Sequence, residues 1–259
     1  MAKRKKTPKI GPLAVLSLLR EVRTGAGDRR PILVDGAREL VPLLARELRA
    51  GGDPSAVREG GGDPHGAAAL VWIGPADDDR LRAASQAHIP IVGLTQGESL
   101  PYVLDTDLVF VRPGERLPAE QVAHALARLL GERGTALAAR LPALRGPVVD
   151  ELIRGMARRN ALVAAAVWVP GVDMPILTLN QIRLVLRIAL AYGEEVGPER
   201  VPELLGVIGA GLGMRAVARE LLDFVPVAGW AVKGALAYGG TRAVGEAARR
   251  RFAMGKETA

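Results

Sequence analysis

The sequence predicts an α/β domain followed by an all-α domain. Short runs rich in Val and Ile alternate with helical patterns between Pro31 and Val111, whereas the residues after Pro118 show helical patterns only. The length of 259 residues also suits two domains of roughly 100 to 150 residues each. We therefore expect a doubly wound, flavodoxin-like or Rossmann-like domain of about five parallel strands, joined to a helical domain.

Five apolar runs are expected to form the strands. They lie at residues 31–34, 55–59, 68–73, 90–94 and 108–111, and the second run is the weakest. Helical patterns follow at residues 37–52, 74–86 and 121–130. Alternation of strands with helices favours a parallel sheet that is covered by helices on both faces.

The predicted domain boundaries follow these patterns. Residues 25–133 form the α/β domain, and residues 145–252 form the helical domain. The other segments are a basic tail with an N-terminal helix (1–24), a helical connector (134–144) and a short tail (253–259). We expect the join near residues 141–148, because Pro142, Gly146 and Pro147 interrupt a helical pattern there.

The net charge of +7 comes mostly from the N-terminus, where Met1 to Lys9 carries five Lys and Arg and no acid. This tail is either a solvated terminus or a contact for acidic lipid or RNA. The chain has only three residues each of Phe, Trp and Tyr, which gives no base-stacking platform, so nucleic acid is not an expected partner. Cysteine is absent, which leaves the redox compartment undetermined. No signal-peptide pattern is visible at the N-terminus, so we expect a cytoplasmic protein.

Ligands of doubly wound sheets bind at the carboxyl ends of the strands. The cofactor-binding candidates at these ends are Asp35, Gly36, Thr95 and Gly97. The order of signals resembles the receiver domain of two-component systems, because an acid follows the first strand and a hydroxyl follows the fourth. The phosphoacceptor aspartate is missing, since Ile73 and Gly74 end the third strand. The resemblance is therefore one of shape, and we do not expect phosphotransfer.

Other catalytic patterns are also missing. No G-x-x-x-x-G-K-[ST] loop occurs, and the three histidines match no metal spacing. The acidic run Asp77–Asp79 either caps a helix or binds magnesium, and capping is the preferred interpretation. The pattern Gly211-x-Gly213-x-x-Ala216 is interpreted as helix packing rather than as a dinucleotide fingerprint. We name no catalytic residue, no cofactor and no metal site.

The second half contains an unusually apolar stretch. The 23 residues from Asn160 to Ile182 hold one charge, Asp173, but prolines and a glycine split them into pieces too short for an ordinary membrane span. Asn180, Arg183 and Arg187 share one face of the following helix. This stripe either faces water, which we favour, or docks a partner.

A later helix carries small residues at intervals of four. These are Ala231, Ala235 and Gly239, with Gly229 and Gly245 nearby. Such spacing lets helix backbones approach closely, both in membranes and in soluble helix pairs. Lys233 and Arg242 interrupt the segment, so a simple span is not predicted.

Two segments carry a family resemblance. VPGVDMPILTLNQIRLVLRIALAYG contains Pro-x-x-Asp, an Asn-Gln helix and a Tyr-Gly stop, and VPVAGWAVKGALAYGGTRAVGEAA contains Pro-x-x-Gly-Trp and Gly-Thr-x-x-x-Gly. Residues 145–252 thereby resemble the bacterial domain-of-unknown-function family that follows Era-like GTPase domains and occurs in YcjF-type inner-membrane proteins. The resemblance implies contact with a membrane and assigns no catalytic residue. The candidate partner or membrane contacts are Trp168, Asn180, Arg183, Arg187, Trp230 and Gly239.

The expected function is that of a non-enzymatic adaptor or membrane-associated interaction protein with a degenerate nucleotide-binding-like domain. The expected partners are an anionic membrane surface, a membrane-bound protein or a second copy of the chain. The alternative is a nucleotide- or dinucleotide-dependent enzyme or switch that uses the strand ends. The expected location is the cytoplasm, peripherally on the inner face of the cell membrane, and the alternative is an integral hairpin.

Overall fold

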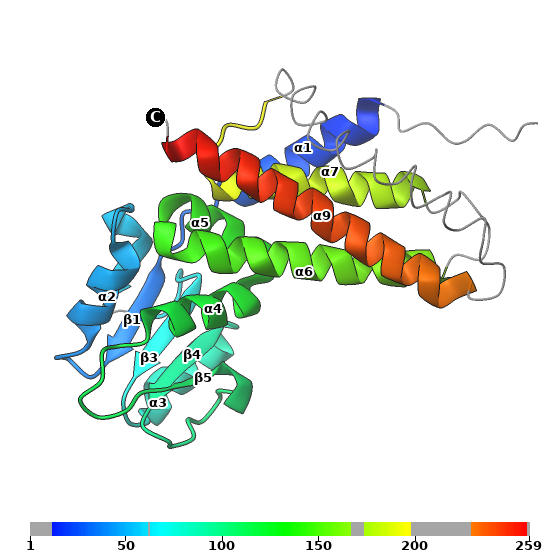
Figure 1. Ribbon diagram of the computed structural model, residues 1–259. Helices are drawn as coiled ribbons and strands as arrows, with labels where there is room; N and C mark the ends of the chain where they lie inside the picture. Colours follow the sequence, from blue (N-terminus) through cyan, green and yellow to red (C-terminus); the bar gives the residue numbers. More distant parts are fainter. Residues whose placement is uncertain (1–11, 62, 167–173, 198–228, 258–259) are drawn as a thin grey trace, which may run out of the picture. The chain divides into compact units, whose positions relative to one another are not determined.

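The computed structural model describes residues 12–61, 63–166, 174–197 and 229–257. These residues form two compact units. The α/β unit comprises Gly27–Glu151, and the helical unit comprises the described residues before Gly27 and from Leu152 onwards. The α/β unit is therefore inserted in sequence between the first helix and the later helices of the helical unit (Figure 1).

The α/β unit contains a five-stranded sheet in which every pair of neighbouring strands is parallel. The strands are β1 (Ile32–Gly36), β2 (Val57–Glu59), β3 (Ala69–Ile73), β4 (Ile91–Thr95) and β5 (Leu108–Phe110). Their spatial order is β2-β1-β3-β4-β5, which is the flavodoxin-like order of doubly wound folds. The predicted fold class is confirmed, including the weak strand β2.

Helices cover both faces of this sheet. Helix α3 (Asp78–Gln86) packs over the face that carries Leu33, Leu70 and Trp72. Helices α2 (Val41–Arg49) and α4 (Ala119–Leu130) pack against each other and against the opposite face (Figure 1). Side chains of a strand alternate between the two faces, so each strand contributes buried side chains to the core on both sides of the sheet.

Short helical turns connect these elements. They are η1 (Pro54–Ala56), η2 (Asp105–Asp107) and η3 (Gly131–Gly134), and η3 continues into α5 (Thr135–Arg140). Residues 134–144 lie within the α/β unit, where Ala138 and Leu141 are fully buried.

The helical unit is built from α1 (Pro12–Ala26), α7 (Met174–Ala191), α9 (Gly229–Glu257) and most of α6 (Pro142–Ala166). Helix α7 packs against both α1 and α9. Every described element after Phe110 is helical, as the sequence predicts. The expected interruption at Gly146 and Pro147 is wrong, because α6 continues through Pro147. The next two residues, Val148 and Val149, are fully buried, and their burial offsets the cost of a proline inside a helix.

Glycines bring α9 close to α6. A Cβ atom at Gly245 would lie 2.6 Å from Ile153 Cγ1, and one at Gly234 would lie 3.3 Å from the carbonyl oxygen of Ala161. Gly245, one of the small residues that the sequence pattern includes, thus lies at a close approach between helices. Ala231, Ala235 and Gly239 are exposed and do not contribute to this contact. Among the described helices, none combines the length and the apolar character that crossing a membrane requires.

Candidate functional site

A pocket opens at the carboxyl ends of β1, β2 and β3. It has a volume of about 520 Å³ and lies where the helix after β1 and the helix after β3 cover opposite faces of the sheet. This is the position at which doubly wound folds bind ligands. Its charged lining residues are Asp35, Arg38, Glu59, Asp77 and Arg80.

Gly36 forms the floor of this pocket at the end of β1. Its φ angle of +117° is unfavourable for any residue with a side chain, and a Cβ atom would lie 2.1 Å from the carbonyl oxygen of Ile73. The next residue, Ala37, donates its backbone N–H to that same oxygen at 2.8 Å. The backbone after β1 is therefore bonded directly to the end of β3.

The negative charge of Asp35 is compensated by other groups of the α/β unit. Its side chain is 13% exposed, Oδ1 accepts the Gly36 N–H at 2.9 Å, and Oδ2 lies 3.1 Å from the Arg80 guanidinium. Asp77 caps α3 by accepting the Arg80 backbone N–H at 3.1 Å, which confirms the capping interpretation. Within the described part of the chain, no group of three or more acidic or histidine side chains could hold a metal ion.

The other two strand-end candidates lie apart from Asp35 and Gly36. Thr95 is buried and lines a second pocket of about 230 Å³, formed by the ends of β3, β4 and β5. Gly97 lies next to it, and its N–H is 3.4 Å from Thr95 Oγ1, but it does not line that pocket. The structure thus divides the four predicted residues between two places.

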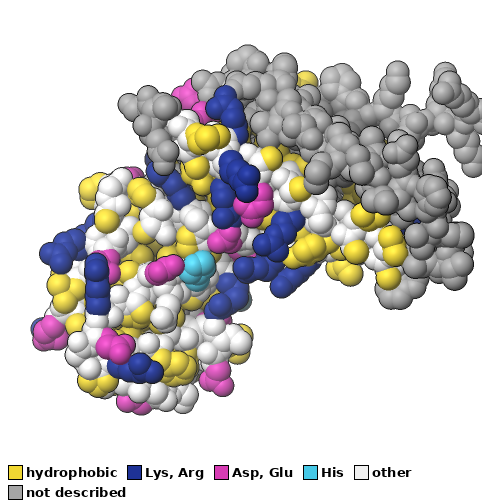
Figure 2. Space-filling view, viewed as in Figure 1, with side chains coloured by type: hydrophobic (Ala, Val, Ile, Leu, Met, Phe, Trp, Pro, Cys, Tyr) yellow, Lys and Arg dark blue, Asp and Glu magenta, His cyan; other side chains and the backbone are white. Residues whose placement is uncertain are grey.

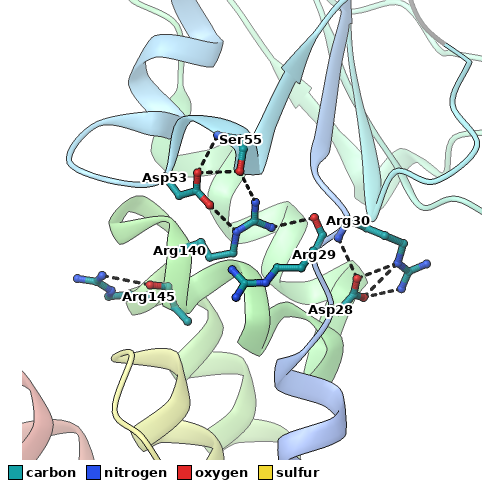
Figure 3. A network of polar contacts seen from close by, with 8 residues as sticks. Asp28, Arg29, Arg30, Asp53, Ser55, Arg140 and Arg145 are labelled. Atoms are coloured by element: carbon teal, nitrogen blue, oxygen red, sulfur yellow. Dashed lines mark hydrogen bonds and ion pairs between the residues drawn. The ribbon is translucent and has the colours of Figure 1, made fainter.

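The amino ends of the strands carry a network that the sequence did not reveal. Arg140 of α5 donates to Asp53 Oδ2 at 2.9 Å, to Ser55 Oγ at 3.0 Å and to the carbonyl oxygen of Arg29 at 3.0 Å (Figure 3). Hydrogen bonds from Ser55 and from Arg140 lower the pKa of Asp53 to about 2. Arg140 is one arginine among many and lies in a segment predicted to be a connector. No feature of the sequence therefore distinguishes it from the other arginines.

A chain of polar side chains crosses the helical unit. Asn180 of α7 donates to Asn160 Oδ1 at 2.7 Å, and Asn160 of α6 donates to Thr241 Oγ1 of α9 at 2.9 Å. The exposed fractions of Asn180, Asn160 and Thr241 are 6%, 0% and 0%. Buried amides require such partners, because an unpaired polar group costs free energy.

The predicted polar stripe of α7 continues this chain outwards. Arg183 contacts Asn180 Oδ1 at 3.3 Å, and Arg183 and Arg187 lie 2.9 and 3.5 Å from the carboxylate of Glu21 on α1. The expectation that this stripe faces water is therefore wrong. Its side chains join α7 to α1 and α6 of the same unit.

The exposed face of α6 has a different character. Arg154, Arg158 and Arg159 are exposed there, and Leu162 one turn further along is 71% exposed. Arg154, Arg158 and Leu162 recur at intervals of four and share one side of the helix. Figure 2 shows Lys and Arg side chains gathered along the part of the helical unit in which α6 lies.

Of the remaining candidate contact residues, Gly239 and Trp230 lie within the described residues and Trp168 does not. Gly239 is exposed on α9, and Trp230 belongs to the first turn of that helix. Trp168 and the Gly211-x-Gly213-x-x-Ala216 pattern lie outside the described residues. Comparisons of this chain with family models, with curated proteins and with solved structures found no match.

Proposed function

We propose that this chain is a non-enzymatic adaptor whose helical unit binds peripherally to an anionic membrane surface. The observation that carries the proposal is the exposed face of α6, where Arg154 and Arg158 are aligned with the 71% exposed Leu162. Cations and an exposed apolar side chain supply the two kinds of contact, electrostatic and hydrophobic, that a helix makes at a membrane interface.

The expected binding is weak and reversible. Each cation near an anionic leaflet contributes about 1 kcal/mol, and burial of one leucine side chain adds about 1.5–3 kcal/mol. Three arginines and one leucine on α6 therefore provide only a few kcal/mol. The five cations of Met1–Lys9 supply a second attraction to the same surface, and two linked weak contacts bind more tightly than either alone.

The strand ends of the α/β unit support a scaffold role. Asp35 is neutralised by Arg80 and by the Gly36 N–H, and Asp77 is used as a helix cap. A general base must be able to accept a proton from a substrate, and these carboxylates are occupied by groups of the protein itself.

Flotation with liposomes tests the proposal. The double variant Arg158→Glu/Leu162→Asp should lower partitioning onto vesicles that contain 30% anionic lipid by about tenfold or more, because it removes a cation and an apolar contact. The matched control is Arg46→Glu/Leu43→Asp, which makes the same changes at exposed positions of α2. Equal binding by both variants, or equal binding of the wild-type chain to neutral vesicles, would refute the proposed surface.

The second proposal is a ligand-dependent switch at the carboxyl ends of β1 and β3. The pocket of about 520 Å³ at that point favours it, since Arg38 lines the pocket and offers donors for anionic groups, and Asp35 holds Arg80 at its wall. A nucleotide that binds only the folded state raises the melting temperature. A panel of nucleotides and dinucleotides should then shift the melting temperature of the wild-type chain but not of Asp35→Ala. If no compound at millimolar concentration shifts the melting temperature, the switch proposal is refuted and only the adaptor proposal remains.

A further inference from the structure

The pocket at the carboxyl ends of β1, β2 and β3 contains two ion pairs of the protein itself. Asp35 lies 3.1 Å from the Arg80 guanidinium, and Glu59 lies 2.5 Å from the guanidinium of Arg49. The members of each pair neutralise one another. The two pairs therefore add no net charge to the pocket, although three of their four side chains line it.

Two further charged side chains line this pocket. Arg38 belongs to the segment between β1 and α2, and Asp77 is the N-cap of α3, which covers the other face of the sheet. Arg38 is exposed, and its side chain has no partner among the described residues. Asp77 is also exposed, and its capping bond uses only Oδ1. The pocket thus offers a ligand one guanidinium and one carboxylate oxygen, Oδ2 of Asp77.

The surroundings of these two side chains differ. Arg38 lies just before α2, and the first residues of that helix, Val41 and Pro42, also line the pocket. The N-terminal end of a helix favours negative charge, so it adds to the attraction of Arg38 for a phosphate group. The charge of Asp77 is instead partly offset by the N-terminus of α3, which it caps. A neutral hydroxyl donor therefore suits Asp77 better than a second ion does.

The charge balance of the pocket limits the ligand to one anionic group. With the two ion pairs set aside, Arg38 is the cation that remains in the lining, and Asp77 repels further negative charge. A triphosphate would bring several negative charges to one guanidinium. The volume of about 520 Å³ lies within the usual range for small-molecule pockets, and Trp72 adds apolar surface for a carbon skeleton.

We infer that this pocket binds a sugar monophosphate, and that Arg38 and Asp77 determine this specificity. The guanidinium of Arg38 binds the phosphate through paired hydrogen bonds. Asp77 accepts a hydrogen bond from a sugar hydroxyl and disfavours polyphosphates. The inference rests on the second proposal, the ligand-dependent switch, and narrows its ligand to compounds that carry one phosphate group.

Isothermal titration calorimetry of the full chain with ribose 5-phosphate, ribose and ATP, all without divalent metal ions, tests the inference. Ribose 5-phosphate should bind about tenfold or more tightly than ribose, which lacks the phosphate, and than ATP, which carries three. Arg38→Glu should weaken the binding of ribose 5-phosphate about tenfold or more. The matched control is Arg46→Glu, which changes an exposed arginine of α2 outside the pocket and should leave the affinity unchanged.

Asp77→Ser separates the charge of this residue from its capping role. Serine still offers an oxygen to cap α3 but carries no charge, so the preference for ribose 5-phosphate over ATP should fall about fivefold or more. Circular dichroism melts establish that each variant is folded. Wild-type binding of ATP as tight as that of ribose 5-phosphate, or an unchanged preference in Asp77→Ser, would overturn the inference and leave the switch proposal standing. Absence of ribose 5-phosphate binding would overturn it as well, and the nucleotide panel then decides the switch proposal separately.

Discussion

Asn160 on α6 and Thr241 on α9 are both fully buried, and a hydrogen bond of 2.9 Å joins the Asn160 amide to the Thr241 hydroxyl oxygen. Asn160 simultaneously accepts from Asn180 on α7, so a single side chain links three helices.

Asn160→Ala should destabilise the helical unit by roughly 2–4 kcal/mol, because it removes the acceptor of the Asn180 side-chain N–H and the donor to the Thr241 hydroxyl oxygen. Urea unfolding gives the free energy. A double-mutant cycle with Thr241→Val should show coupling of about 1 kcal/mol, whereas additive effects would mean that the hydrogen bond contributes nothing to stability.

Gly36→Ala should be far more destabilising than Gly97→Ala. Both glycines have positive φ angles, +117° and +131°, so both variants incur backbone strain of about 1–3 kcal/mol. Only at position 36 does the added Cβ meet backbone, 2.1 Å from the Ile73 carbonyl oxygen, whereas position 97 is open. Denaturant unfolding should show an additional loss of about 2 kcal/mol or more for Gly36→Ala. Similar losses for the two variants would contradict the close approach of β1 and β3.

Asp53 should contribute to acid unfolding of the α/β unit. Its pKa is lowered from 3.8 to about 2, so the folded state favours the charged carboxylate. The resulting stabilisation is fully present above pH 4 and is lost as the pH falls from about 4 to about 2. Urea melts at several pH values should show a smaller loss over this window for Asp53→Asn than for the wild-type chain.

Other carboxylates contribute to the same acid transition, which makes the comparison between variants essential. The pKa of Asp28 is also lowered, chiefly by a side-chain hydrogen bond from Arg30, and burial partly opposes this shift. The Asp105→Asn variant serves as the control for the removal of one carboxylate at an exposed position. An unchanged slope in Asp53→Asn would show that the Arg140 network does not persist in solution.

Gly245→Ala should loosen the contact between α9 and α6. The new Cβ would lie 2.6 Å from Ile153 Cγ1, and Ile153 is only 3% exposed, so the two side chains overlap. Overpacking of this kind costs about 1–3 kcal/mol. The losses caused by Gly245→Ala and Ile153→Ala, measured as shifts of the thermal midpoint, should be less than additive in the double variant, because the smaller side chain at position 153 makes room for the new methyl group. Gly239→Ala, at an exposed position of the same helix, should not lower the midpoint.

The sequence predicted the sheet well because each strand is a local feature. Apolar runs bounded by Gly, Pro and Asp are visible in a window of a few residues, and all five became strands. Capping of α3 by Asp77 was equally local. Pairings between distant residues were not predictable, because nothing near Arg140 indicates Asp53, which lies 87 positions earlier.

The same limit explains the errors in the helical unit. A helical repeat identifies residues that share a face, and Asn180, Arg183 and Arg187 do share one. The repeat does not predict which element packs on that face. In this protein the element is α1, which lies more than 150 positions earlier in the sequence. The small-residue pattern of α9 has a related limit. Helix α9 contains several rows of small residues, and only packing against α6 decides which row is inside.

The insertion of the α/β unit into the helical unit has a consequence for synthesis on the ribosome. Glu21 of α1 pairs with Arg183 of α7, 162 residues later. At about 5–20 residues per second, the partner of α1 is made roughly 8–30 s after α1 itself. During this interval Leu18, Leu19 and Val22, which are buried in the finished protein, have no α7 to pack against. The apolar face of α1 therefore lacks its α7 partner while the entire α/β unit is being translated, and an exposed apolar helix is the kind of segment that chaperones recognise.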